Sequence, residues 1–354
     1  MNTIDPDLLQ VMRDVVRSRG LIDRLDQGVD GIRLEGAQWH QLQELGLATL
    51  TLPEEHGGSG ASWLESAALL REAAAAAAHL PLVETDLLAA WLLREADLPV
   101  DDRPRTVAVL DESGHSPLVP WAGEVERIVV LAHADGRRVV ADLDPSDVDI
   151  EPVASRSGLP RSSVRVTGTV DGTPVDDGTE TQILLRGALG RAVQSVGAME
   201  RIVELCVEHT TVRVQFGRPL CKFQSVQNLV SDIAAETALA RSAVDAAVTD
   251  AAITDLAGPS SAFRVAVARS CVGHASSTVI RNAHQVHGAI GTTVEHPLQL
   301  LTLPLLDWRN EFGGVRFWDR LLGSTLRATS GSVWELATGA TSAEFDKVLM
   351  EASR

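Results

Sequence analysis

The amino-acid sequence predicts a mostly helical α+β protein with a small β domain in its middle. In two long segments, Leu189–Val207 and Val226–Ala247, apolar residues recur at three- and four-residue steps, the period of one buried helix face. After Pro104 this pattern gives way to short β-rich runs separated by turn residues. We therefore expect three domains, residues 1–104, 105–186 and 187–354, in the order helical, β, helical.

Composition excludes several classes of function. The formal net charge of −17 argues against nucleic acid or an anionic membrane as a partner, because both are bound by basic surfaces. Although 45% of the residues are hydrophobic, no uninterrupted apolar run is long enough to span a membrane. The first residues lack the layout of a secretory signal, and the three cysteines are far apart and lack metal-ligand spacing. A cytoplasmic location fits best.

The amino-terminal third is expected to be helical. Residues 5–17 have one apolar face, and Trp39, Leu42 and Leu45 give a second short stripe. An extended segment and a glycine-rich loop, PEEHGGSG at residues 53–60, follow. On its own this loop is weak evidence for phosphate binding, and we interpret it as a turn.

The middle third is expected to form a small antiparallel β domain. Five β-rich runs indicate its strands: Thr106–Leu110, Arg127–Ala132, Arg138–Leu143, Ser163–Val170 and Thr181–Leu185. Ala134, Asp135 and Gly136 predict a hairpin turn between the second and third runs.

The segment between the two long helical patterns, TVRVQFGRPLCKFQ at residues 211–224, carries the strongest chemical signal. Gly217 and Pro219 interrupt the helical period, which predicts two antiparallel helices joined by a turn. The turn interleaves cations with aromatic rings and an amide: Arg213, Phe216, Arg218, Lys222, Phe223 and Gln224. An anion attached to a flat ring system would use all of these groups, whereas a plain solvated basic loop needs none of the aromatic residues.

This turn resembles the R-x-x-F-G-x-x-[LI]-x-x-x-Q turn of the acyl-CoA dehydrogenase family, through Arg213, Phe216, Gly217, Leu220 and Gln224. A predicted helix at residues 261–286 ends in QVHGAIGTTVEHP, which is similar to the family's Q-[IV]-x-G-G-x-G-x-x-x-E-x-P. The matching residues there are Gln285, Gly288 and Ala289, with alanine in place of the second glycine. The resemblance implies a carboxy-terminal four-helix-bundle domain. It also implies that Arg213, Phe216, Leu220, Gln224, Gln285, Gly288 and Ala289 bind the FAD of a neighbouring subunit.

The sequence departs from the family where the flavin ring and the catalytic base are expected. VLDESGHSP, residues 109–117, stands where members often have Thr-Glu-Pro…Gly-Ser-Asp, so Ser113 or Ser116 would have to contact the ring. Trp121 is either a further ring contact or a buried core residue. At the two places where members carry the glutamate base, ungapped counting finds Phe312 and Gly187. Glu311 takes the base position only if one residue has been deleted, and otherwise it is a solvated or capping carboxylate.

The resemblance therefore implies a subunit for FAD-dependent α,β-dehydrogenation of an acyl-CoA thioester. We expect a homologous acyl-CoA dehydrogenase subunit as partner in a heterotetramer, a bulky or polycyclic acyl group, and electron-transfer flavoprotein or a similar electron acceptor. Two alternatives stay open: a self-sufficient homotetramer that uses Glu311, and a non-catalytic or oxygenase relative on the same fold. We expect no bound metal, because His284, His287 and His296 fit no common zinc template.

Overall fold

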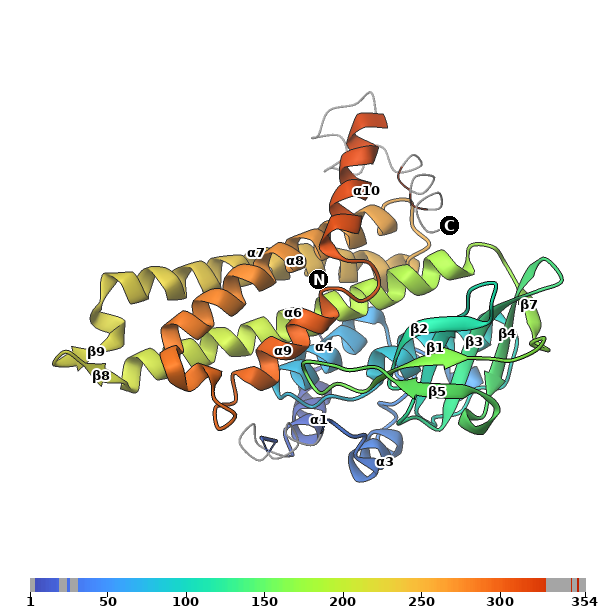
Figure 1. Ribbon diagram of the computed structural model, residues 1–354, viewed down its shortest axis with the longest axis horizontal. Helices are drawn as coiled ribbons and strands as arrows, with labels where there is room; N and C mark the ends of the chain where they lie inside the picture. Colours follow the sequence, from blue (N-terminus) through green and yellow to red (C-terminus); the bar gives the residue numbers. More distant parts are fainter. Residues whose placement is uncertain (1–3, 19–23, 26–30, 329–344, 346–348, 350–354) are drawn as a thin grey trace.

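The computed structural model of the 354-residue chain describes residues 4–18, 24–25, 31–328, 345 and 349. Two blocks lie side by side, a helical block and a β block (Figure 1). Within the described residues, no helix combines the length and the apolarity that crossing a membrane requires.

The amino-terminal helices form the base of the helical block. They are α1 (Pro6–Val16), α3 (Gly36–Glu44), α4 (Trp63–Ala75), the π-helical η2 (Val83–Ala90) and α5 (Trp91–Glu95), with a short 3₁₀ turn η1 (Glu54–His56). A capping box begins α4: Ser62 accepts from the Leu64 amide, and Glu65 reaches back to the Ser62 amide. The predicted helices at residues 5–17 and around Trp39 are confirmed. The segment expected to be extended is a series of turns through η1.

The β block contains two small sheets. The first has the strand order β1 (Arg105–Val109), β3 (Arg127–Ala134), β4 (Arg137–Leu143) and β7 (Thr173–Val175). The second has the order β2 (His115–Pro120), β6 (Arg161–Arg165) and β5 (Asp149–Pro152), which follows the 3₁₀ turn η3 (Pro145–Asp147). The hairpin turn between β3 and β4 is confirmed, because Asp135 and Gly136 both have positive φ.

The small antiparallel β domain is confirmed, although it contains one parallel pair, and one predicted strand is wrong. β1 pairs with β3 in parallel, whereas every other pair in these two sheets is antiparallel. The chain between them enters the other sheet as β2, and β3 therefore returns in the direction of β1. Residues 181–185, predicted as a strand, belong to helix α6 (Thr179–Val212). Their β-branched residues favour a strand, but the apolar spacing continues into the helix and tertiary packing decides.

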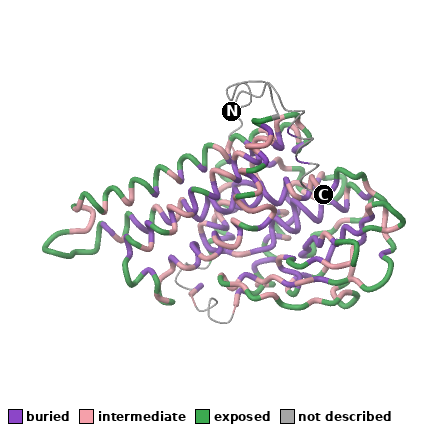
Figure 2. Tube along the Cα trace, turned by 45° about the horizontal axis from the view of Figure 1, so that its top comes forward, coloured by how far each residue is buried: buried purple, intermediate pink, exposed green. Residues whose placement is uncertain are grey.

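Three long helices form the carboxy-terminal bundle: α6, α7 (Gln224–Thr254) and α8 (Ser261–His287). Two shorter helices, α9 (Gln299–Trp308) and α10 (Val315–Ala328), pack against α6 and α8. The end of α6 and the start of α7 are joined by the hairpin β8 (Val214–Gln215) and β9 (Arg218–Pro219) and the 3₁₀ turn η4 (Leu220–Lys222). This hairpin lies at the end of the bundle farthest from the sheets (Figure 1). Burial is concentrated where the bundle meets the other domains, whereas its far end is exposed (Figure 2).

Candidate functional site

The hairpin at the far end of the bundle is shaped by two residues with positive φ. Phe216 (φ 53°) and Gly217 (φ 79°) form a two-residue turn between the paired residues Gln215 and Arg218. Positive φ at both central positions is characteristic of the type I′ turn, which matches the twist of the strands. Phe216 is therefore held at the outermost point of the chain, where it is 89% exposed.

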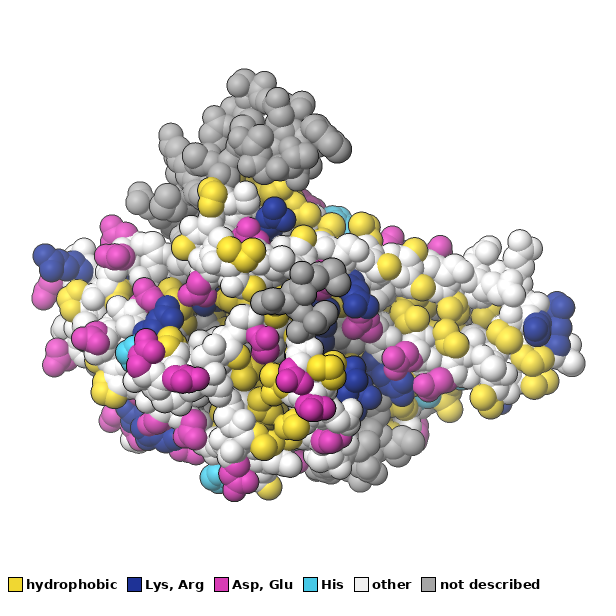
Figure 3. Space-filling model, turned by 180° about the vertical axis from the view of Figure 1, so that it is seen from behind, with side chains coloured by type: hydrophobic (Ala, Val, Ile, Leu, Met, Phe, Trp, Pro, Cys, Tyr) yellow, Lys and Arg dark blue, Asp and Glu magenta, His cyan; other side chains and the backbone are white. Residues whose placement is uncertain are grey.

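The cations of this hairpin are not neutralised by any carboxylate that the structure describes. Among the described residues, Arg213, Arg218 and Lys222 form no ion pair with a carboxylate. The Arg218 guanidinium lies 4.2 Å from the centroid of the Phe223 ring. Basic and apolar side chains gather together at this end of the molecule (Figure 3). Such a surface can bind an anion that carries a ring system.

A groove of about 950 Å³ connects this hairpin with the turn that follows α8. That turn is η5 (Gly288–Thr292), and Gly288 begins it with φ 64° at the end of α8. A Cβ on Gly288 would meet no atom within 4 Å, so the backbone there is open to a ligand. Five of the residues predicted to bind the cofactor line the groove: Arg213, Leu220, Gln285, Gly288 and Ala289.

The other two predicted cofactor residues lie outside the groove lining. Phe216 is at the exposed turn, where its ring packs edge-on against Phe223 at 6.2 Å between centroids. Gln224 is the exposed first residue of α7. These positions leave both side chains available to a neighbouring chain.

Sequence reasoning missed three histidines that line the same groove: His209 of α6, His287 of α8 and His296. The sequence identifies His287 and His296 only as residues that fit no zinc template, and it gives no sign of His209. Among the residues described, no three or more potential metal ligands are arranged so that they could hold a metal ion. Since the three histidines come from three separate segments, their spacing in the sequence gives no signal.

The region where the base is expected lies far from the groove, at the other end of α6. Arg191 and Arg213 are 22 residues apart on this helix, which corresponds to about 33 Å. Phe312, with φ 50°, places its ring against the backbone of Gly187, where a Cβ would overlap the ring. The two positions that the resemblance implies for a base, Phe312 and Gly187, therefore touch each other.

Glu311, the candidate base, forms a buried ion pair. Its Oε2 accepts a hydrogen bond from Nε of Arg191 at 2.6 Å, and its side chain is 8% exposed. The same guanidinium donates to Glu84 and, at 2.7 Å, to Gln194. Burial raises the pKa of Glu84, opposed by Arg191 and reinforced by Glu311. Glu311 is thus bound to a cation in a site that two further side chains complete.

A second buried arginine fixes the backbone around Glu311. Nη2 of Arg269 donates to the carbonyls of Glu311 at 2.7 Å, Gly313 at 3.0 Å and Trp308 at 3.1 Å. Burial lowers the pKa of Arg269 to about 10. Two buried guanidiniums therefore hold the segment between α9 and α10, and the left-handed conformation of Phe312 is held with it.

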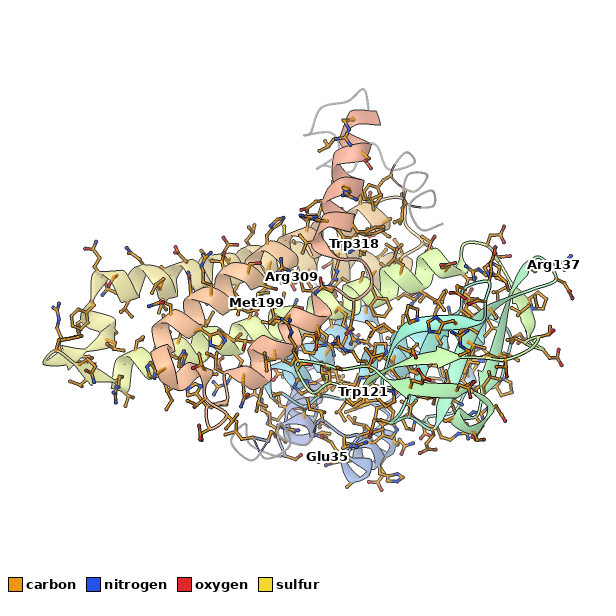
Figure 4. All side chains as sticks on the ribbon, in the orientation of Figure 1. Glu35, Trp121, Arg137, Met199, Arg309 and Trp318 are labelled. Carbon is orange, nitrogen blue, oxygen red and sulfur yellow. The ribbon has the colours of Figure 1, made fainter. Side chains whose placement is uncertain are left out.

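The residues proposed for the flavin ring are engaged within the β block. The Ser113 hydroxyl donates to Asp111 at 2.7 Å inside a tight loop, and Ser116 is buried in β2. Trp121 is 3% exposed, has φ 64°, and lies at the boundary between the sheets and the helices (Figure 4). Its burial agrees with the prediction that Trp121 is a core residue. The groove therefore suits the phosphate end of a dinucleotide, whereas the Ser113 hydroxyl is already bonded and Ser116 is buried.

The helical–β–helical order, with two turns meeting at one groove, defines an acyl-CoA dehydrogenase fold. Residues 8–96 match the model of the acyl-CoA dehydrogenase N-terminal domain, and residues 179–305 match that of the C-terminal domain. The chain belongs to the acyl-CoA dehydrogenase family.

Individual relatives agree with this assignment. The chain is 28% identical over 263 residues to acyl-CoA dehydrogenase IpdE2 of Mycolicibacterium smegmatis, covering 74% of this chain and 79% of that protein. It shares its fold with the ChsE4–ChsE5 complex of Mycobacterium tuberculosis, with a TM-score of 0.85, 22% identity, and coverage of 94% and 100%. Two further solved structures of the same fold are the Tcur3481–Tcur3483 steroid ACAD G363A variant (TM-score 0.80, 21% identity, coverage 92% and 98%) and PigA with FAD and proline (TM-score 0.78, 14% identity, coverage 92% and 99%).

Proposed function

We propose that this chain is the subunit of a hetero-oligomeric acyl-CoA dehydrogenase that lacks the base and lends its hairpin to the FAD held mainly by a homologous partner. The observation that carries this proposal is the contact of the Phe312 ring with Gly187, because neither residue can accept a proton. The open groove beside Arg213 supports the lending role. In such an assembly there are fewer active sites than subunits.

The roles of this chain's own residues follow from their chemistry. Arg213 and the backbone of Gly288 would hold the phosphates, and Phe216 would pack against the partner subunit. The bound FAD would supply the hydride acceptor for α,β-dehydrogenation. The proton would be removed by a carboxylate of the partner, since Glu311 of this chain is bound to Arg191.

The substrate class is proposed from the relatives. One solved structure of this fold is a complex of two different chains, ChsE4 and ChsE5, and another is described as a steroid ACAD. We propose a bulky, polycyclic acyl-CoA as the substrate of the assembly and an electron-transfer flavoprotein as its electron acceptor. Both are inferences from similarity of fold.

The first experiment is purification of the chain alone and with homologous neighbouring chains, with the visible flavin spectrum and the native mass measured on each. We expect a chain that is poor in flavin alone and a complex with fewer flavins than subunits. In the complex, Arg213→Met should lower flavin content without changing the mass. Arg241→Met, which removes an exposed ion pair with Glu200, should not. A homotetramer with one flavin per chain would refute the proposal.

A second measurement separates this proposal from the self-sufficient alternative. If Glu311 were the base, Glu311→Gln would abolish turnover while the flavin stayed bound. We expect instead that turnover of the complex is preserved in this variant, because Glu311 only pairs with Arg191. Steady-state kinetics at equal flavin content distinguishes the two outcomes.

A further inference from the structure

In the groove, His287 contacts both of the other histidines. The ring centroids of His209 and His287 are 4.6 Å apart, and those of His287 and His296 are 4.7 Å apart. All three line the groove together with Arg213 and the turn at Gly288. We refer to His209, His287 and His296 as the histidine cluster.

The hydrogen bonding of His287 assigns its tautomer. Its Nδ1 lies 2.9 Å from the carbonyl oxygen of Ala283, which only accepts, so Nδ1 carries the proton. In the neutral ring Nε2 is then unprotonated. Among the described residues this buried nitrogen makes no hydrogen bond of normal geometry, although the backbone of Leu205 also interacts with the ring, and the residue is 5% exposed. A basic nitrogen in a wall of a ligand-sized groove is available to accept a proton.

The groups that face the cluster are basic or uncharged. From α6 comes Arg213, and from α8 comes His284. The groove residues from η4 and α7 are uncharged, and the groove lining includes neither aspartate nor glutamate. The charged groups described around the cluster would therefore repel a proton on it, although backbone hydrogen bonds favour the protonated ring of His287. An anion in the groove would be the first counter-charge.

The pKa shifts of the three histidines agree with this charge distribution. Burial, and then the neighbouring histidines, lower the pKa of His296 to about 4. Burial is also the largest cause of the lowered pKa of His287 and of His209. For His209, the charges of His287 and Arg213 lower the pKa further. Without an anion the cluster is neutral at neutral pH.

We propose that the histidine cluster takes up a proton when the phosphate group of a dinucleotide enters the groove, and so adds a second positive charge beside Arg213. This inference rests on the proposed function, since it concerns the same groove. The negative charge of the phosphate raises the affinity of the neighbouring imidazoles for protons, and by linkage protons raise the affinity of the groove for phosphate. Binding then tightens as the pH falls. This occurs between the higher pKa that the cluster has with phosphate bound and the lower pKa that it has without phosphate.

The test measures protons directly, by calorimetric titration of the deflavinated assembly with FAD in buffers of different ionisation enthalpy. FAD is the suitable probe because its doubly esterified pyrophosphate does not itself titrate near neutral pH. We expect net proton uptake on binding, and an affinity that rises by up to roughly tenfold per unit fall in pH where one proton is coupled.

Variants assign the proton to the cluster. His296→Asn and, separately, His209→Gln should bind FAD but with reduced proton uptake and a weaker pH dependence. His56→Asn, in η1 on a different domain, should behave as the unchanged protein, and the native mass reports folding of each variant. Binding without proton uptake, or binding that weakens as the pH falls, would overturn this inference and leave the proposed function intact. An assembly in which Arg213→Met leaves FAD affinity unchanged would instead overturn the proposed function.

Discussion

Arg191 carries one positive charge between two buried carboxylates, Glu84 and Glu311. Removing a single partner from such a site leaves the remaining charges without compensation in a medium that solvates them poorly. The ion pair with Arg191 also fixes Glu311 and thereby the segment that holds Phe312. At the scale of residues, the place expected for a catalytic base has become part of the structural core.

Arg191→Met should therefore lower the free energy of unfolding by about 3–5 kcal/mol. The matched control is Arg201→Met, which breaks ion pairs with the exposed Glu204 and Glu208 and should change it by about 1 kcal/mol or less. Urea denaturation of both variants measures the difference. Equal, small losses would mean that Arg191 does not stabilise the core.

Asp86 gives a pH dependence that belongs to one residue. Its carboxylate accepts hydrogen bonds from Thr51 and Ser66, but burial raises its pKa from 3.8 to about 6. Between these two values the folded chain binds more protons than the unfolded chain, so this residue's contribution falls as the pH rises, by up to about 3 kcal/mol. Asp86→Asn should abolish this dependence of stability on pH. The free energy of unfolding of the variant, minus that of the unchanged protein, should therefore increase from pH 4 to pH 6. A constant difference in denaturation experiments would contradict it.

Residue by residue, the sequence predicts only those parts of the site that are local. Arg213 and Leu220 are found because their spacing lies within one turn. The pairing of Glu84 with Arg191 joins residues 107 positions apart and leaves no local pattern. The same is true of the histidine cluster, since His209 meets His287 only after α6 and α8 have packed.

At the scale of elements, α6 connects the two ends of the molecule. It is 34 residues long and buried through its first half, where α4 packs against it. Gly197 allows this close approach, because a Cβ there would overlap the backbone of Arg71 in α4. The sequence predicts the helix from its apolar period but places its start ten residues late, because β-branched residues at its beginning favour a strand.

Gly197→Ala should force α4 and α6 apart and lower stability by about 1–3 kcal/mol. Gly36→Ala is the matched control: this glycine is the first residue of α3 and has no atom within 4 Å of the added Cβ. It should leave stability unchanged or raise it by up to about 1 kcal/mol, as alanine favours helix. Thermal unfolding of the two variants compares them, and equal midpoints would show that the helices can separate without cost.

At the scale of the whole molecule, the far end of the bundle exposes a surface that suits contact with a neighbouring chain. Val212 is 80% exposed and Phe216 is 89% exposed, next to cations that have no carboxylate partner in the described part of the chain. Exposed apolar side chains gathered in one place indicate an interaction surface. The domain order could be predicted from composition. The position of this surface in the molecule could not, because it depends on how three helices pack.

Limited digestion with trypsin should show whether a partner chain covers the hairpin end of the bundle. Arg213 and Lys222 are exposed cleavage sites in the hairpin segment, whereas trypsin does not cleave after Arg218, because Pro219 follows it. We expect rapid cleavage there in the isolated chain and protection in the flavin-containing complex, followed by mass spectrometry of the fragments. Cleavage at equal rates in both forms would show that the hairpin does not contact the partner.

The length of α6 has a consequence for how such proteins diverge. The hairpin and the Phe312 segment contact opposite ends of a helix about 50 Å long, so substitutions at one end are not felt at the other. After a gene duplication, one copy can lose its acid–base chemistry while selection still preserves its hairpin, because the sister copy depends on it. Two genes that begin as equivalents can in this way become obligate halves of one enzyme.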